Sequence, residues 1–248
     1  MAIRKLFKNT YRISEWGPFG PVKMYLLIGS KKALLIDCGY GKIDLKKIIG
    51  KLTDKPVTLL LTHGHIDHAR GCFAFDDVYL DQDDFDVYRK HSDIEFQKNY
   101  FKKTVERGKI KKLDFDTFDL GNRKVSIIKT PGHTQGSICV IDPYSHIAFL
   151  GDTINPYDVW LGLDESTSVE EYQKSLKKLL YEINKYRIDH LYSGHNTLPM
   201  KQKKIIDFIR LCDKIINNEV KGRKTDKGIC KGYKAKYKSA ALIYKERI

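Results

Sequence analysis

Residues 59–71 constrain the fold of this chain more than any other stretch of its sequence. An apolar run, Leu-Leu-Leu, leads through a threonine into His63, His65, Asp67 and His68. When three imidazoles and a carboxylate directly follow a buried strand, they lie in the loop after it and can act as metal ligands there. We therefore expect the chemistry of the protein at this strand end.

Strands expected further along the chain end in the same kinds of side chain. A strand over residues 124–130 leads to His133, and a strand over 146–152 ends in Asp152. A short strand that begins at residue 190 leads to His195. The remaining three histidines are expected to be surface or structural residues: His91, His146 and His190.

These residue types suit two metal ions. Three histidines can bind one zinc ion through neutral imidazoles and leave a fourth position for water: His63, His65 and His133. A second ion can be bound by one carboxylate and two imidazoles: Asp67, His68 and His195. Asp152 can bridge the two ions through its two carboxylate oxygens. His63 and His65 are two positions apart and point the same way from an extended segment, whereas the adjacent Asp67 and His68 need a turn.

Strands and helices alternate around this motif. We expect strands at 24–29, 33–37, 57–62 and 77–81, a hairpin at 137–152, and helices at 45–52, from residue 168 and at 202–217. Residues 83–112 are expected to form a helical insertion that either overhangs the site or simply connects two elements. Residues 153–167 are expected to form a loop, in which Tyr157 and Trp160 either line the substrate pocket or pack as ordinary aromatics. A last strand at 241–244 is placed at a sheet edge.

Length and composition fit a single domain over residues 1–248, with 42% hydrophobic residues. The first residues interrupt their apolar positions with charges, so no signal peptide is expected, and no run is long enough to span a bilayer. The five cysteines are far apart and form no CxxC pair, which favours reduced thiols. We therefore expect a cytoplasmic protein without membrane contact, and the sequence gives no basis for an oligomeric state.

The net charge of +14 is concentrated near the end of the chain. Residues 201–248 contain 15 Lys or Arg and 5 Asp or Glu, so this basic C-terminal tail accounts for 15 − 5 = +10. Such a tail can bind nucleic acid or an anionic substrate, or it can be a solvated basic surface. Composition favours the solvated surface over nucleic acid.

Four motifs together resemble those of the metallo-β-lactamase superfamily of hydrolases: His63-x-His65-x-Asp67-His68, Pro131-Gly-His133-Thr, Gly151-Asp152-Thr and Ser193-Gly-His195. The resemblance runs from about Tyr25 to Asn196. It implies an α/β (α+β) fold, a four-layer αβ/βα sandwich with the metals at one edge between two mixed sheets. It also places His63, His65 and His133 on the first metal site, Asp67, His68 and His195 on the second, and Asp152 on the bridge. Asp37 resembles an early aspartate that supports the motif loop.

Two divalent cations of this kind, zinc first with iron or manganese as alternatives, would lower the pKa of a bridging water from 15.7 towards about 7. The resulting hydroxide would attack a carbonyl carbon or phosphorus while the metals stabilise the developing charge. Asp67 is the expected catalytic residue besides being a ligand, because it can take or relay a proton when the intermediate collapses.

The bridging Asp152 argues against a true β-lactamase, since those members usually have Cys or Ser at that position. The layout resembles hydroxyacylglutathione hydrolases (glyoxalase II) and acyl-homoserine lactonases, which favours a small acyl substrate, either a thioester or a lactone. Glyoxalase II has a helical C-terminal domain for glutathione, and the roughly 50 residues after His195 argue against that substrate.

Two other enzyme classes stay open. A phosphodiesterase of the transfer-RNA-processing type would explain the basic tail, but no RNA-clamping arm is visible in the sequence. A mononuclear iron persulfide dioxygenase would leave the second set of ligands free. A non-catalytic binding module is disfavoured because no ligand position has been lost.

Overall fold

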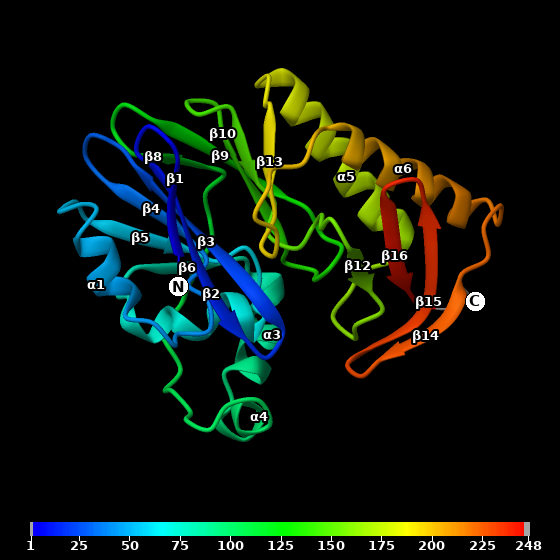
Figure 1. Cartoon of the computed structure of the whole chain (residues 1–248), viewed down its shortest axis with the longest axis horizontal. Coiled ribbons are helices and arrows are strands. Elements are labelled where there is room, and N and C mark those ends of the chain that lie inside the picture. Colours follow the sequence, from blue (N-terminus) through cyan, green and yellow to red (C-terminus); the bar gives the residue numbers. More distant parts are fainter. Residues whose placement is uncertain (1, 246–248) are drawn as a thin grey trace.

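The computed structural model of the protein describes residues 2–245, and the strands within this range form three sheets (Figure 1). The seven-stranded sheet has the order β1-β2-β3-β4-β5-β6-β7. Its strands are β1 (Ala2–Phe7), β2 (Thr10–Gly17), β3 (Gly20–Ile28), β4 (Ala33–Ile36), β5 (Val57–Leu60), β6 (Val78–Leu80) and β7 (Lys111–Lys112). The five-stranded sheet has the order β13-β11-β10-β9-β8. Its strands are β8 (Thr117–Asp119), β9 (Lys124–Lys129), β10 (Ile138–Asp142), β11 (Ile147–Phe149) and β13 (His190–Tyr192).

The central strands are apolar on both faces, and their alternate residues enter two different cores. In β3, Tyr25 and Leu27 face the five-stranded sheet, whereas Met24 and Leu26 face the helices on the other side. Strand β10 shows the same division, because Val140 contacts the seven-stranded sheet and its neighbours Cys139 and Ile141 contact helices. Since successive side chains of a strand point to opposite faces, both sheets must be covered on both sides.

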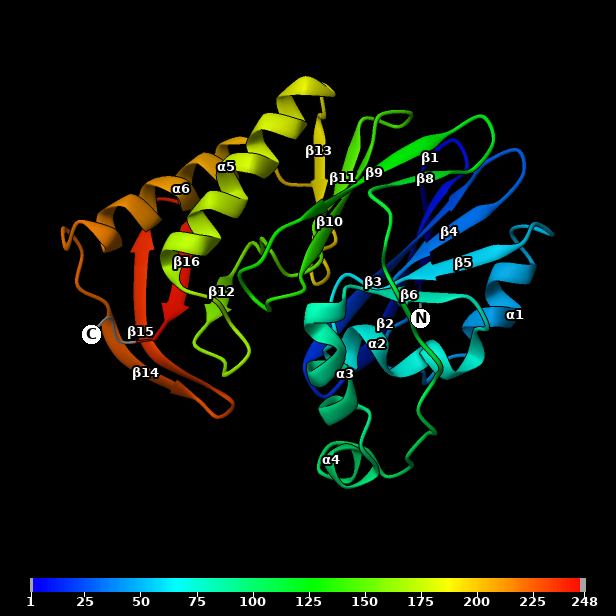
Figure 2. The same cartoon turned by 180° about the vertical axis from the view of Figure 1, so that it is seen from behind.

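Helices cover the two outer faces (Figure 2). Those beside the seven-stranded sheet are α1 (Leu45–Gly50), α2 (Ile66–Ala69), α3 (Phe85–His91) and α4 (Ile94–Lys98), with the 3₁₀ turns η1 (Arg70–Ala74) and η2 (Gln82–Asp84). Those beside the five-stranded sheet are α5 (Val169–Lys185) and α6 (Lys203–Ile216). The two sheets pack against each other, and helices cover the outer face of each sheet. This is the expected four-layer sandwich, so the prediction is confirmed.

Helix α5 shows why the outer layer packs where it does. Ser168 begins the helix as expected, because its side chain accepts a hydrogen bond from the Glu171 N–H at 3.2 Å. The buried face lies at helical spacing: Val169, Tyr172, Leu176, Leu179 and Ile183. Each such apolar side chain stabilises the fold by about 1.5–3 kcal/mol when removed from water. No helix in residues 2–245 is long and apolar enough to cross a membrane.

The part of the expected basic tail that follows α6 is folded, and together with β12 it forms a third sheet. Its order is β12-β16-β15-β14, with β12 (Asp158–Leu161), β14 (Arg223–Lys227), β15 (Cys230–Tyr237) and β16 (Ala240–Tyr244). Two predictions are wrong here. The segment 153–167 is not all loop, because β12 lies in it, and β16 is not an edge strand, because it pairs with β12 on one side and β15 on the other. The apolar Ala-Leu-Ile-Tyr sequence of β16 is buried along its whole length, which suits an inner strand.

One edge of the sandwich collects the expected ligand residues. Strands β9, β11 and β13 run in the same direction, since β10 is antiparallel to both β9 and β11, and β11 is parallel to β13. Their carboxyl ends therefore meet at one edge, where the Ile138 N–H donates a 2.9 Å hydrogen bond to the Thr62 carbonyl at the end of β5. Residues 83–112 contain α3 and α4 beside this edge, followed by β7, which pairs with β6.

Candidate metal centre

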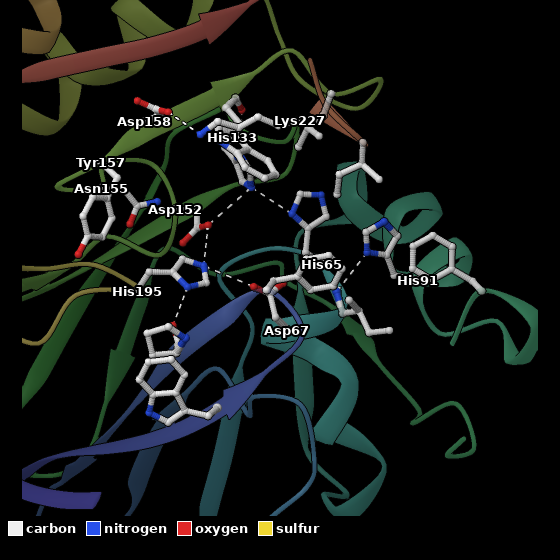
Figure 3. A pocket seen from close by; sticks show the side chains of 18 residues that line it. His65, Asp67, His91, His133, Asp152, Asn155, Tyr157, Asp158, His195 and Lys227 are labelled. Atoms are coloured by element: carbon white, nitrogen blue, oxygen red, sulfur yellow. Dashed lines mark hydrogen bonds and ion pairs between the residues drawn. The ribbon is translucent and has the colours of Figure 1, made fainter. Parts of the chain in front are cut away.

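All seven expected ligands come together at this edge. Figure 3 labels those that line the cavity: His65, Asp67, His133, Asp152 and His195. They follow the carboxyl ends of four strands or lie on α2: His63, His65, Asp67, His68, His133, Asp152 and His195. Their donor atoms form three overlapping groups, and within each group the atoms lie within 4.8 Å of one another. The groups are His63 with His65 and His133, His63 with His68 and Asp152, and Asp67 with His68 and His195.

Asp152 lies between the two ends of this cluster. Its Oδ2 is 3.0 Å from Nε2 of His195 and 3.8 Å from Nε2 of His133, and its Oδ1 is 3.5 Å from Nε2 of His68. At one end, Nε2 of His133 lies 3.0 Å from Nδ1 of His65. The carboxylate is thus within reach of imidazoles from both groups of three.

In each imidazole, the ring nitrogen that points away from the cluster, here called the outward nitrogen, contacts an oxygen atom. Two of these nitrogens contact backbone carbonyls, which only accept: Nδ1 of His133 lies 2.9 Å from the Trp160 oxygen, and Nδ1 of His195 lies 2.8 Å from the Pro21 oxygen. The other three outward contacts are His63 Nδ1 with Thr62 Oγ1 at 3.0 Å, His68 Nδ1 with Asp37 Oδ2 at 2.7 Å, and His65 Nε2 with Glu165 Oε1 at 2.8 Å. An outward N–H that is donated leaves the inward nitrogen with a lone pair, which is how histidine is oriented at metal sites.

The pKa shifts of the cluster residues favour the binding of a positive charge at the centre of the cluster. Burial lowers the pKa of His63 well below its usual value, and burial also lowers the pKa of His133 to about 4, so both rings are neutral. Burial opposes the charged form of Asp152, but the imidazoles of His195 and His68 hold its pKa well below the usual range. Although burial lowers the pKa of His68, the carboxylates of Asp67, Asp37 and Asp152 raise it to about 10.

The cluster meets a further requirement for binding metal. Within residues 2–245, Nε2 of His63 and Oδ1 of Asp152 are buried without a hydrogen-bond partner. A buried polar atom without a partner costs about 1–3 kcal/mol. Both atoms belong to groups of three donors, and imidazole nitrogen with carboxylate oxygen is a donor set that binds zinc and related divalent ions. The residues present therefore fit divalent metal ions.

Two buried aspartates that are not in the cluster shape the ligand loops. Asp37 accepts hydrogen bonds from the Thr62 N–H at 2.7 Å and the Thr62 hydroxyl at 2.9 Å, and it also contacts His68, as expected of a supporting residue. Asp84 accepts from the N–H groups of Gly64 and Gly136 at 2.8 and 2.7 Å and from the Thr134 hydroxyl at 2.7 Å. Asp84 thereby ties the loop of His63 and His65 to the loop of His133.

A stack of rings supports His65 from the side. His91 lies parallel to His65 with ring centroids 4.8 Å apart, and Phe96 lies on the other face of His91 at 4.5 Å. Nδ1 of His91 accepts the Ile66 N–H at 3.1 Å, and burial lowers the pKa of this ring to about 3. His91 is thus buried beside His65, and it also lines the cavity.

The cluster forms the floor of a cavity of about 390 Å³. Its walls are mostly apolar and come from several elements: Trp16, Phe19, Pro21, Ile66, Phe96, Tyr157, Trp160, Leu163 and Ile229. Both residues proposed as pocket walls, Tyr157 and Trp160, line it, Tyr157 being 71% exposed. His91 and Phe96 place part of the 83–112 segment in the wall.

Three residues of the site could not be recognised from the sequence: Glu165, Asp84 and Ile229. Glu165 follows β12 in a segment that was expected to be loop, and no spacing rule links it to His65. Asp84 is one of four aspartates within residues 81–86, of which the structure buries Asp81 and Asp84 and leaves Asp83 and Asp86 exposed. Ile229 lies at the tip of the β14–β15 hairpin, and this hairpin was not predicted from the sequence.

Comparison with known proteins agrees with the site. The sequence profile of the Metallo-beta-lactamase superfamily matches residues 17–184, more than half of the chain. Acyl-coenzyme A thioesterase MBLAC2 of Bos taurus is 25% identical over 203 residues, covering 69% of this chain and 72% of that protein. Hydroxyacylglutathione hydrolase 1 of Vibrio vulnificus is 26% identical over 201 residues, covering 76% and 71% respectively.

A solved structure agrees with the architecture. The metallo-beta-lactamase from Pontibacter korlensis superimposes with a TM-score of 0.66 at 16% identity, covering 86% of this chain and 98% of that one. This likeness concerns the fold alone. The profile match over residues 17–184 shows that the chain belongs to the metallo-beta-lactamase superfamily.

Proposed function

We propose that this protein is a metal-dependent hydrolase that binds two divalent ions and cleaves the thioester, or the related lactone, of a small acyl substrate. The observation that supports this most is the arrangement of the imidazoles, in which every outward nitrogen is held and every inward nitrogen is turned towards Asp67, Asp152 or a second imidazole. Such an arrangement serves metal ligation and has no use in an ordinary hydrophobic core.

In this proposal His63, His65 and His133 hold the first ion, and Asp67, His68 and His195 hold the second. Asp152 would contribute to both sites, in keeping with its position between the two groups. Zinc is the first choice for a set of imidazoles and carboxylates, with iron or manganese as alternatives. Bound there, the ions supply Lewis acidity to the acyl oxygen and lower the pKa of a water towards about 7.

In this proposal, the protein's own residues transfer the proton, exclude water and position the substrate. Asp67 is the proposed catalytic residue, because its Oδ2 lies 3.4 Å from Nε2 of His195 at the cavity floor, where it can accept a proton and pass it to the leaving thiol or alcohol. Trp160, Tyr157 and Leu163 exclude water from the acyl group and position its carbonyl above the cluster. The outward hydrogen bonds of the histidines keep the ligand geometry fixed throughout.

The cavity walls favour an acyl group over a phosphodiester. Among the described lining residues the only lysine or arginine is Lys227, and its ammonium group is 2.7 Å from the Asp158 carboxylate. A nucleic-acid backbone needs several unpaired cations along its path. The names of the two curated relatives also describe acyl groups on thiol compounds, which favours a thioester over a lactone.

The proposal is tested by metal analysis and a substrate screen on the same preparation. Protein purified without added metal is analysed for its metals and then assayed with thioesters, lactones, β-lactams and phosphodiesters. Asp152→Ala serves as the blank, and Asp164→Ala, which removes an exposed carboxylate outside the cluster, serves as the matched control. We expect two ions per chain and thioester cleavage that disappears only in Asp152→Ala. One iron per chain with oxygen uptake would instead indicate a dioxygenase, and cleavage of phosphodiesters alone would indicate a nuclease.

A further inference from the structure

A basic hollow lies on the third sheet, outside the metal cavity. It has a volume of about 450 Å³ and is lined by residues of β14, β15 and the segment before them: Val220, Lys221, Arg223, Lys224, Thr225, Lys234, Ala235 and Lys236. Five of these eight residues are cationic, and no carboxylate is among the described lining residues. We call this surface the basic hollow. It lies beyond residues 17–184, so it is an addition to the part of the chain that matches the superfamily.

Most of the charge in the basic hollow is not compensated by residues 2–245. Arg223 stands directly opposite Lys234 in the β14–β15 pair, and like charges in that position repel each other. Among residues 2–245 no carboxylate forms an ion pair with Lys221, Arg223, Lys224 or Lys236. Lys234 has a partner in Asp158, but it shares that carboxylate with Lys227. An anion bound in the hollow would therefore relieve repulsion as well as gain direct contacts.

The basic hollow is connected to the metal cavity through Asp158. Oδ2 of this residue accepts from Nζ of Lys234 at 2.8 Å and from Nζ of Lys227 at 2.7 Å. Lys234 lines the hollow, whereas Lys227 and Asp158 line the cavity. Figure 3 shows Asp158 and Lys227 at the rim beside His133. A ligand that crosses this rim can reach both places at once.

We propose that the basic hollow binds the phosphate groups of a phosphorylated thiol to which the acyl group is attached. This inference rests on the proposed thioesterase function and names its substrate class. The acyl group lies in the apolar cavity, an uncharged arm passes Asp158, and the phosphates meet Arg223, Lys224 and Lys236. Phosphate accepts charge-assisted hydrogen bonds from arginine and lysine, which makes these side chains suitable partners. Two thiols have this chemistry: coenzyme A, and the phosphopantetheine group of an acyl carrier protein.

Charge-neutral variants test the proposal. Arg223→Gln, Lys224→Gln and Lys236→Gln are combined in one protein, and all three side chains are exposed and lie outside the metal cavity. The matched control combines Lys5→Gln, Lys51→Gln and Lys124→Gln, which removes the same charge from exposed positions elsewhere. Each protein is assayed with one acyl group attached to coenzyme A, to pantetheine without phosphate, and to a phosphopantetheinyl carrier protein.

We expect the hollow variant to raise KM about tenfold for the coenzyme A thioester, the carrier-protein thioester or both, with kcat unchanged. KM for the pantetheine thioester should stay as in wild type, and the control variant should behave as wild type throughout. An effect confined to one phosphorylated substrate identifies the natural thiol. Equal KM changes for all three substrates, or none for any, would overturn the proposal.

Calorimetric titration with free coenzyme A separates this inference from the proposed function. Salt-sensitive binding that is lost in the hollow variant supports the hollow even if no thioester is cleaved. Hydrolysis of the pantetheine thioester without coenzyme A binding supports the hydrolase and overturns the hollow. Loss of binding to a short RNA in the hollow variant, with thioester kinetics unaffected, would assign the basic hollow to nucleic acid instead.

Discussion

Oε1 of Glu165 lies 2.8 Å from Nε2 of His65, although the two residues are 100 positions apart in the chain. Burial opposes ionisation of this carboxyl, but the hydrogen bond with His65 lowers the pKa of Glu165 to about 2. Glu165 is therefore ionised at neutral pH and accepts the Nε2–H of His65. The contact fixes the ring with Nδ1 towards His133 and makes that nitrogen a better electron donor.

Replacement of Glu165 by glutamine should weaken metal binding by about 10- to 100-fold, because a neutral amide holds the imidazole less firmly. Competition with a chromophoric chelator measures this affinity directly and does not depend on any substrate. Glu171→Gln changes a partly exposed carboxylate on α5 and should leave the affinity unchanged. Equal affinities in wild type and Glu165→Gln would show that the carboxylate does not support ligation.

Asp84→Asn should lower the free energy of unfolding by about 2–3 kcal/mol. The buried carboxylate accepts three hydrogen bonds, and an amide nitrogen at that position would face donors from Gly64, Thr134 or Gly136. Urea denaturation of the metal-free protein gives the value without interference from bound ions. Asp83→Asn alters the exposed neighbouring aspartate and should stay within about 0.5 kcal/mol of wild type. A loss of similar size in both variants would refute the role of Asp84.

Two glycines should respond in opposite ways to alanine. At Gly132 an added Cβ would lie 2.4 Å from Cδ2 of the buried Tyr172 ring, so Gly132→Ala should destabilise the fold by about 1–3 kcal/mol. At Gly50, in α1, an added Cβ meets nothing within 4 Å, and Gly50→Ala should stabilise by about 0.5–1 kcal/mol. Thermal unfolding of the two variants side by side gives the comparison. Destabilisation by Gly50→Ala would contradict the open surroundings of that position.

Ile229→Ala should reduce kcat/KM for long acyl groups by about tenfold and leave short ones unaffected. The side chain stands at the tip of the β14–β15 hairpin and lines the cavity, where each buried methylene of a substrate contributes roughly 1–3 kcal/mol. A series of thioesters of increasing chain length measures the effect. Leu198→Ala removes an exposed apolar side chain that does not line the cavity and serves as the control. A uniform change across the series would argue against contact with the acyl chain.

Removal of metal should lower the unfolding temperature. A ligand that binds only the folded state stabilises it by about 2.7 kcal/mol at a hundredfold excess over Kd. Without the ions, Nε2 of His63 and Oδ1 of Asp152 are buried polar atoms without a partner. Calorimetric scans before and after dialysis against a chelator should therefore differ by several degrees. His65→Ala, with a weakened site, should show a smaller difference, and an equal difference would show that the chelator acts elsewhere.

The strands that lead to the seven clustered residues were predictable because their signals are local. An apolar run that ends in several ligand-type residues indicates a strand end, and the same sign recurs at His133, Asp152 and His195. The capping box at Ser168 likewise needs only four consecutive residues. Strand β12 carries a weaker signal, since only four residues pair and its partner β16 is far away in the sequence.

The supporting contacts depend on distant parts of the chain and could not be predicted in the same way. Nothing near Glu165 in the sequence points to His65, and one acidic residue among 31 carries no distinguishing mark. The β14 sequence, Arg-Lys-Thr-Asp-Lys, has no apolar alternation, so charge alone suggested a tail. It is a strand because the neighbouring β15 supplies its backbone partners along one side.

The pairing of β12 with β16 also sets the order in which the metal centre can be completed. Trp160, whose carbonyl orients His133, lies beside Ile243 of the last described strand. His63 and His65 are synthesised before that strand, and the domain can complete its folding only when all of its strands have been made. A nascent chain therefore presents several imidazoles before the wall that fixes His133 exists. Completion of the proposed metal site therefore requires the last described strand, and loss of β16 would remove the strand that pairs with β12 and holds the Trp160 carbonyl beside His133.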